Sequence, residues 1–192
     1  MGLSLEEQIN INIKTHLSLL KLNSEVNKTI KVIAKKIKNG GKLLLCGNGG
    51  SAADAQHLAA EFLVRLRPNV NRKAIPAISL AQDTSTLTAC GNDYSFDDIF
   101  VRTLQAIGKK KDILVCISTS GNSKNILKVL KEAKKKNIYS VGFLGKGGGK
   151  AKKMCNQPLI ISSNNTARIQ ECHIFLGHFI LEKVEDYVMS KI

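Results

Sequence analysis

Three short apolar runs, each followed by a turn of small or polar residues and then by a helical segment, constrain the fold of this chain most. The runs cover residues 42–46, 112–117 and 138–144. Continuous apolar runs of this length are typical of strands buried on both faces of a parallel sheet. Because strands and helices alternate along the chain, the sequence predicts an α/β fold in which helices cover both faces of a parallel sheet.

Weaker signals complete the predicted order of elements. Two further strands are expected at residues 77–80 and 159–161. Helices are predicted over residues 51–65, 82–90, 96–107, 124–136 and 166–189. Residues 66–76, which include two prolines, are predicted to form a loop.

The segment before the first strand is predicted to be helical over residues 4–38. Ser4 and Glu7 have the spacing of a capping box, and apolar residues recur with a helical period behind them. A lone helix of this length cannot bury its own apolar stripe. We therefore expect it to pack against another subunit or to fold back as two helices near Asn23.

The composition is that of a globular protein with a large excess of lysine. The 192 residues suit one domain, residues 41–192, with an N-terminal helical arm, residues 1–40. The net charge of +14 raises the possibility of nucleic-acid binding, but Trp is absent and aromatic residues make up only 5%. Only five of the 29 basic residues are Arg, the side chain on which base readout depends most. We expect solvated lysine faces and no nucleic-acid partner; general attraction of anionic substrates is the alternative.

Nothing in the sequence predicts a membrane segment or an exported protein. No stretch reaches 18 consecutive apolar residues, and residues 1–7 lack the basic start and apolar core of a signal peptide. The five cysteines are odd in number and widely spaced, so no disulfide framework is predicted. We expect a reduced, cytoplasmic protein.

Two predicted strand-to-helix turns have the composition of ligand-binding loops. The small residues of 47–51 (GNGGS) let a ligand approach the backbone beside a helix N-terminus, although they match neither GxGxxG nor GK[ST]. Residues 118–123 (STSGNS) place four hydroxyls at a helix start, which suits the phosphate of a sugar phosphate. The alternatives are a plain tight turn at 47–51 and a serine-rich N-cap at 118–123.

Two predicted helices each present a pair of residues on one face. His57 and Glu61 are four positions apart on the first, and Gln170 and His178 are eight apart, slightly more than two turns, on the last. Together they could hold a divalent metal, with zinc favoured by two imidazoles, or supply a general base and a general acid. On spacing alone, ordinary surface or buried roles are the stronger alternative. His173 is predicted to be structural.

Residues 91–93 (GND) are predicted to form a turn after the 82–90 helix. Asn92 and Asp93 could bind sugar hydroxyls, or they could cap the helix that begins at Phe96. The sequence supports these two alternatives equally.

Six motifs occur together in an order and spacing typical of one family. They are residues 46–51 (CGNGGS), 54–57 (DAQH), 91–93 (GND), 117–123 (ISTSGNS), 145–149 (GKGGG) and 167–171 (ARIQE). On these motifs, residues 42–180 resemble the phosphoheptose isomerase family of SIS-domain proteins. The resemblance implies a flavodoxin-like parallel sheet with helices on both faces, assembled as a homotetramer.

The resemblance also implies an activity, namely interconversion of sedoheptulose 7-phosphate and D-glycero-D-manno-heptose 7-phosphate. This is the entry step to heptose for lipopolysaccharide or capsule. The resemblance implies that the hydroxyls of 118–123 bind the phosphate. The full set of residues that it implies in substrate binding is Asn48, Gly49, Gly50, Ser51, Glu61, Asn92, Asp93, Ser118, Thr119, Ser120, Ser123 and Gln170. Glu61 and His178 would be the acid–base pair. One zinc per subunit would be held by His57, Glu61, Gln170 and His178.

Two alternatives without catalysis are also considered. One is a SIS protein that binds a replication initiator, and the other is a sugar-phosphate sensor that binds DNA. The presence of both Glu61 and His178 disfavours the first. The second is disfavoured because no helix-turn-helix segment is visible outside the domain.

Overall fold

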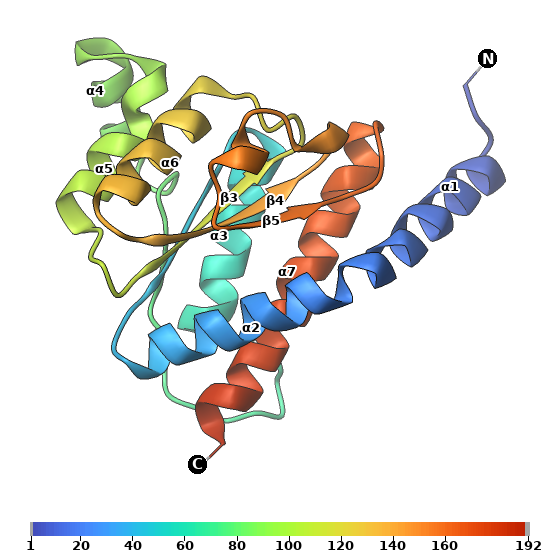
Figure 1. Cartoon of the computed structure of the whole chain (residues 1–192), viewed down its shortest axis with the longest axis horizontal. Helices are drawn as coiled ribbons and strands as arrows, with labels where there is room; N and C mark the ends of the chain where they lie inside the picture. The colour runs from blue at the N-terminus through green and yellow to red at the C-terminus, as the bar shows by residue number, and fades with distance from the viewer. Residues whose placement is uncertain (1, 191–192) are drawn as a thin grey trace.

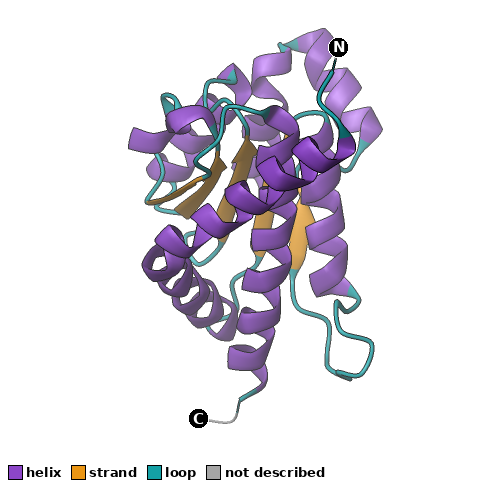
Figure 2. Cartoon of the chain, turned by 90° about the vertical axis from the view of Figure 1, so that its right-hand side faces the viewer, coloured by secondary structure: helices purple, strands orange, loops and turns teal. Residues whose placement is uncertain are grey.

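A computed structural model describes residues 2–190 as a five-stranded parallel sheet between two layers of helices (Figure 2). The strands are β1 (Leu43–Gly47), β2 (Ala77–Ser79), β3 (Ile113–Ser118), β4 (Tyr139–Leu144) and β5 (Gln157–Ile160). Their order in the sheet is β2-β1-β3-β4-β5, which is the flavodoxin-like order. The predicted fold class is therefore confirmed.

Helices cover both faces of the sheet, as predicted (Figure 1). One layer consists of α2 (Asn23–Lys38), α3 (Gly50–Leu63) and α7 (Thr166–Met189), and the other of α4 (Thr84–Asp93), α5 (Ile99–Ile107) and α6 (Lys124–Lys135). Alternate strand residues serve the two layers, since Leu43 and Leu45 join the first core and Leu44 and Cys46 the second. Within residues 2–190, no helix combines the length and apolar character that crossing a bilayer requires.

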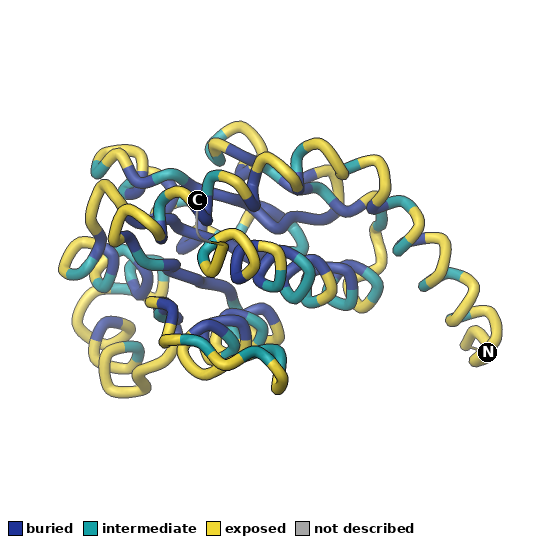
Figure 3. The backbone as a smooth tube through the Cα atoms, turned by 90° about the horizontal axis from the view of Figure 1, so that it is seen from below, coloured by how far each residue is buried: buried dark blue, intermediate teal, exposed yellow. Residues whose placement is uncertain are grey.

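The N-terminal segment consists of two helices that differ in burial. A 3-10 turn at Leu19–Leu22 separates α1 (Leu5–Ser18) from α2, close to the break expected at Asn23. The apolar face of α2, including Ile30 and Ile33, lies in the core. Helix α1 does not fold back but projects from the body with a largely exposed surface (Figure 3).

The predicted turn at residues 91–93 is wrong, because α4 continues through Asp93 and ends at Tyr94. The N–H of Tyr94 donates to the carbonyl of Cys90 at 3.1 Å, so the helical bonding continues past Gly91. Gly91 has a negative φ, and a glycine that keeps this conformation does not end a helix. Two smaller differences from the prediction remain. The last strand begins at Gln157 and not at residue 159, and the glycine-rich loop contains a 3-10 turn, Lys146–Gly148.

Candidate active site

The two predicted ligand-binding turns lie side by side at the carboxyl edge of the sheet. Strands β1 and β3 are neighbours, and Gly47 at the end of β1 pairs with Ile117 near the end of β3. The side-chain amides of Asn48 and Asn125 exchange two hydrogen bonds of 3.0 and 2.8 Å, which join the first turn to the start of α6. In this strand order, ligands bind where the order reverses, between β1 and β3. Asn125 had no signal in the sequence that would have identified it.

The hydroxyls of the 118–123 turn fall into two groups. Ser118 accepts the N–H of Gly121 at 3.1 Å, and Ser120 accepts the N–H of Asn122 at 3.2 Å, so these two shape the turn itself. Ser123 is the N-cap residue of α6, yet its hydroxyl makes no capping bond. The alternative of a serine-rich cap is therefore not what the structure shows. In the first turn of α6 the N–H of Ile126 donates to Asn125 Oδ1 at 2.9 Å, and among the described residues the N–H groups of Lys124 and Asn125 form no hydrogen bond, so these two are available to an anion.

The glycine-rich loop after β4 packs directly on this turn. Gly121 has a φ of +62°, and a Cβ there would overlap the carbonyl of Gly148. The N–H of Lys150 donates to Asn122 Oδ1 at 3.0 Å, and the N–H of Ala151 donates to the carbonyl of Gly121 at 2.9 Å. These contacts hold the turn in one conformation.

Helices α3 and α7 bring three of the four predicted ligands together. His57 Nε2 lies 2.8 Å from His178 Nε2 and 3.4 Å from Glu61 Oε1. The ligand atoms of these three residues all lie within 4.8 Å of one another. Gln170 lies near the start of α3, because a Cβ added at Gly50 would be 2.6 Å from its Nε2. The residues that helical spacing placed on shared faces are thus close together in the structure.

The cluster fits a divalent cation such as zinc. Two imidazole nitrogens and a carboxylate oxygen are donors that zinc favours. The Glu61 side chain is 17% exposed and the His57 side chain 48%, so the site is open to solvent on one side.

A half-buried carboxylate, Asp54, lies on α3 about one turn before His57. Asp54 Oδ2 is buried and has no hydrogen-bond partner within residues 2–190. Burial raises the pKa of Asp54, and the nearby His57 opposes that shift. The 54–57 motif pointed to this segment, but the sequence assigned no role to Asp54.

Asn92 and Asp93 lie at the exposed end of α4. The Asn92 amide donates to Asp93 Oδ1 at 2.8 Å. Within the described chain, neither side chain forms a hydrogen bond to the two turns. Their predicted contact with the sugar stays a prediction.

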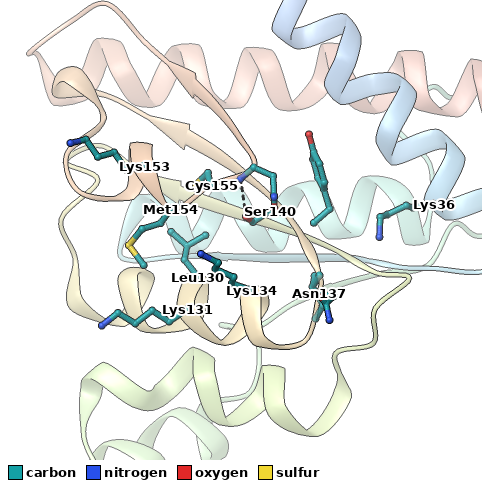
Figure 4. A pocket seen from close by; sticks show the side chains of 12 residues that line it. Lys36, Leu130, Lys131, Lys134, Asn137, Ser140, Lys153, Met154 and Cys155 are labelled. Carbon is teal, nitrogen blue, oxygen red and sulfur yellow. Dashed lines mark hydrogen bonds between the residues drawn. The ribbon is translucent and has the colours of Figure 1, made fainter.

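A lysine-lined cleft lies elsewhere, at the starts of β4 and β5 (Figure 4). It has a volume of about 560 Å³ and is lined by Lys36, Lys131, Lys134 and Lys153, with no carboxylate among the lining residues. The two candidate turns follow β1 and β3 at the opposite, carboxyl edge of the sheet. This part of the lysine excess therefore does not belong to the candidate active site.

Comparisons with known proteins find relatives along most of this chain. The SIS domain family matches residues 12–145. The phosphoheptose isomerase of Clostridium acetobutylicum is 47% identical over 184 residues, covering 94% of this chain and 93% of that protein. The solved phosphoheptose isomerase of Neisseria gonorrhoeae is 37% identical with a TM-score of 0.87, covering 95% of this chain and 100% of that one.

A second solved structure, the phosphoheptose isomerase of Francisella tularensis, is 32% identical with a TM-score of 0.89 and covers 96% of this chain and 100% of that one. These relatives are isomerases, so the two alternatives without catalysis are not favoured. The chain belongs to the phosphoheptose isomerase family of SIS-domain proteins.

Proposed function

We propose that this chain interconverts sedoheptulose 7-phosphate and D-glycero-D-manno-heptose 7-phosphate. The convergence of His57, Glu61 and His178 beside a hydroxyl-rich turn is the observation that carries the proposal. The relatives named as phosphoheptose isomerases support the substrate class. We also propose that the reaction takes place in the cytoplasm and supplies heptose for lipopolysaccharide or capsule.

The proposed reaction moves one proton between C1 and C2 of the sugar through an enediol. The Glu61 carboxylate removes the proton from C1 of the ketose and returns it to C2. The imidazole of His178 moves the second proton between the oxygens on C1 and C2. General acid–base groups of this kind contribute about 10²–10⁴-fold to the rate.

The far end of the substrate is held by the 118–123 turn. Helix α6 offers its N-terminal N–H groups there, and Ser118, Thr119, Ser120 and Ser123 supply hydroxyls. Binding at the phosphate orients the sugar without taking part in the chemistry. The remaining sugar contacts are assigned to residues 48–51, Asn92, Asp93 and Gln170.

The proposed metal is one zinc per subunit, held by His57, Glu61, Gln170 and His178. When bound, zinc polarises the carbonyl and stabilises the negative charge that develops on oxygen. Glu61 and His178 belong to both the acid–base pair and the ligand set.

We propose that the chain assembles as a homotetramer through its arm. Leu5 is 77% exposed and Leu17 60%, and a groove of about 300 Å³ between the arm and α7 is lined mainly by apolar side chains, including Phe175 and Phe179. An apolar surface of this kind on a projecting helix is typical of a subunit interface.

The decisive experiment is an isomerase assay on the purified chain with sedoheptulose 7-phosphate, with and without a chelator. We expect conversion to the aldose, measured by chromatography or NMR as loss of the ketose and an equal gain of the aldose. A chain that binds the sugar phosphate without converting it, under metal-replete conditions, would show that the proposed activity is wrong.

A further inference from the structure

We propose that Arg72 is a positioning residue that locks the C-terminal end of α3 to α7, so that the two pairs of site residues stay facing each other. Arg72 lies in the loop between α3 and β2 and does not belong to the candidate site. The inference rests on the function proposed above, because it concerns the geometry of the same site.

Arg72 binds the last turn of α3 through three backbone carbonyls. Its Nη2 donates to the carbonyl of Glu61 at 2.8 Å, and its Nη1 donates to the carbonyls of Phe62 at 2.9 Å and Val64 at 3.4 Å. Nη1 shares its hydrogens with a third carbonyl, that of Lys73 in its own loop, at 3.1 Å. The last four carbonyls of a helix have no partner within the helix. One guanidinium therefore fixes the end of the helix at the very residue that supplies the proposed base.

The same guanidinium is anchored on α7. Arg72 Nε donates to Glu185 Oε2 at 2.6 Å, and the two side chains are only 4% and 2% exposed. Glu185 lies seven residues, or about two helical turns, after His178, so the anchor and the imidazole project from the same side of α7. Arg67 Nε donates to the other carboxylate oxygen at 2.8 Å. Arg72 thus joins the two helices that provide every proposed zinc ligand.

Fold stability alone does not account for this arrangement. Replacing a buried ion pair with apolar side chains of similar volume is often neutral or stabilising. A lysine would supply the same charge, but it lacks the planar fork that donates in several fixed directions at once. The fork meets one carboxylate of α7 and three carbonyls at the end of α3, besides the carbonyl of Lys73 in its own loop, and so fixes the crossing of α3 and α7.

The test uses the full-length chain with four variants. The double variant Arg72→Met with Glu185→Met removes both buried charges together, and Arg72→Lys keeps the charge but not the fork. Arg67→Met is the matched control, since Arg67 binds the same carboxylate without a hydrogen bond to α3. Glu61→Gln reports on the site itself. Each variant is measured for Tm, kcat, KM and zinc affinity by competition with a chelating indicator.

We expect the double variant and Arg72→Lys to keep a Tm near that of the wild type. Both should lose about 10–100-fold in kcat and in zinc affinity, which is the usual effect of removing a group that orients metal ligands. The KM of these two variants should change less than about twofold, because the phosphate turn lies on other elements. The control Arg67→Met should keep both kcat and zinc affinity. Normal kcat and zinc affinity in Arg72→Lys, with Glu61→Gln inactive, would overturn this inference alone. So would a loss of kcat that only matches the loss of folded protein. Normal turnover in Glu61→Gln would instead overturn the proposed function.

Discussion

The Nε2 atoms of His57 and His178 lie 2.8 Å apart, although the two residues are 121 positions apart in the chain. A contact of this length is a hydrogen bond when one ring carries its proton on Nε2 and the other does not. Two charged imidazolium rings would repel each other. The two rings are thus in hydrogen-bonding range, and Glu61 Oε1 lies 3.4 Å from His57 Nε2.

Removing either acid–base group should lower turnover with little effect on phosphate binding. We expect Glu61→Gln and His178→Gln each to reduce kcat by about 10²–10⁴-fold. Because the two residues act as one unit, the double variant should lose much less than the product of the single effects. Both should also bind zinc more weakly, as measured by metal content after dialysis. Unchanged zinc content with reduced kcat would leave the acid–base assignment standing and refute the metal assignment.

The hydroxyls of the phosphate turn should separate by function. Within the described residues, Thr119 and Ser123 use no side-chain hydrogen bond to build the turn, so Thr119→Val with Ser123→Ala should raise KM about tenfold or more at nearly constant Tm. Ser118→Ala should lower Tm as well, because a buried hydroxyl that accepts the N–H of Gly121 is lost. Steady-state kinetics and thermal denaturation distinguish the two cases. If KM does not change in any of these variants, the phosphate is bound elsewhere.

Charges on the exposed face of α1 should disrupt assembly without unfolding the subunit. Ile9 and Ile13 are each 49% exposed, so Ile9→Glu with Ile13→Glu should yield smaller species by analytical ultracentrifugation. Lys14→Glu, on an exposed position of the same helix, is the control. Deleting residues 1–38 is a harsher change, because it also removes α2 and its part of the core. A variant that stays tetrameric with both glutamates would contradict an interface on this face.

His173 should make stability depend on pH without affecting catalysis. It is fully buried, and burial lowers its pKa from the usual 6.5 to about 4. The unfolded chain therefore binds the proton more readily than the native state, and its contribution to stability is present above pH 6.5 and lost as pH falls toward 4. The difference in unfolding free energy between wild type and His173→Leu should shift by about 3 kcal/mol across this window, in favour of the variant at low pH. Urea denaturation at several pH values measures it. A pH-independent difference would show that His173 titrates alike in both states.

The sequence was sufficient to predict the α/β class, because the β1 and β3 segments are unbroken apolar runs, and such runs are typical of strands buried on both faces of a sheet. It also placed His57 with Glu61 and Gln170 with His178 on shared faces, since helical spacing is a local property. That α3 and α7 face each other is not local. It followed from the resemblance, and the structure brings the pairs together.

Other features could not be predicted, for physical reasons. Asn125 and Arg72 bind partners that are distant in sequence. Asn125 lies at the start of a helix and Arg72 in an irregular loop, and neither place has a periodic sequence pattern from which burial could be predicted. The turn at Gly91 was predicted from a residue that often ends helices, but helical bonding to Tyr94 prevails here.

Helix α7 supplies Gln170, His178 and Glu185, and it follows every strand of the sheet. A ribosome-bound chain that has emerged only as far as β5 already contains the turn at 118–123, but it lacks half of the proposed ligands and the anchor of Arg72. The proposed site is therefore complete only after α7 has been synthesised and has docked against α3. Turnover is for this reason a stricter reporter of complete folding than formation of the sheet.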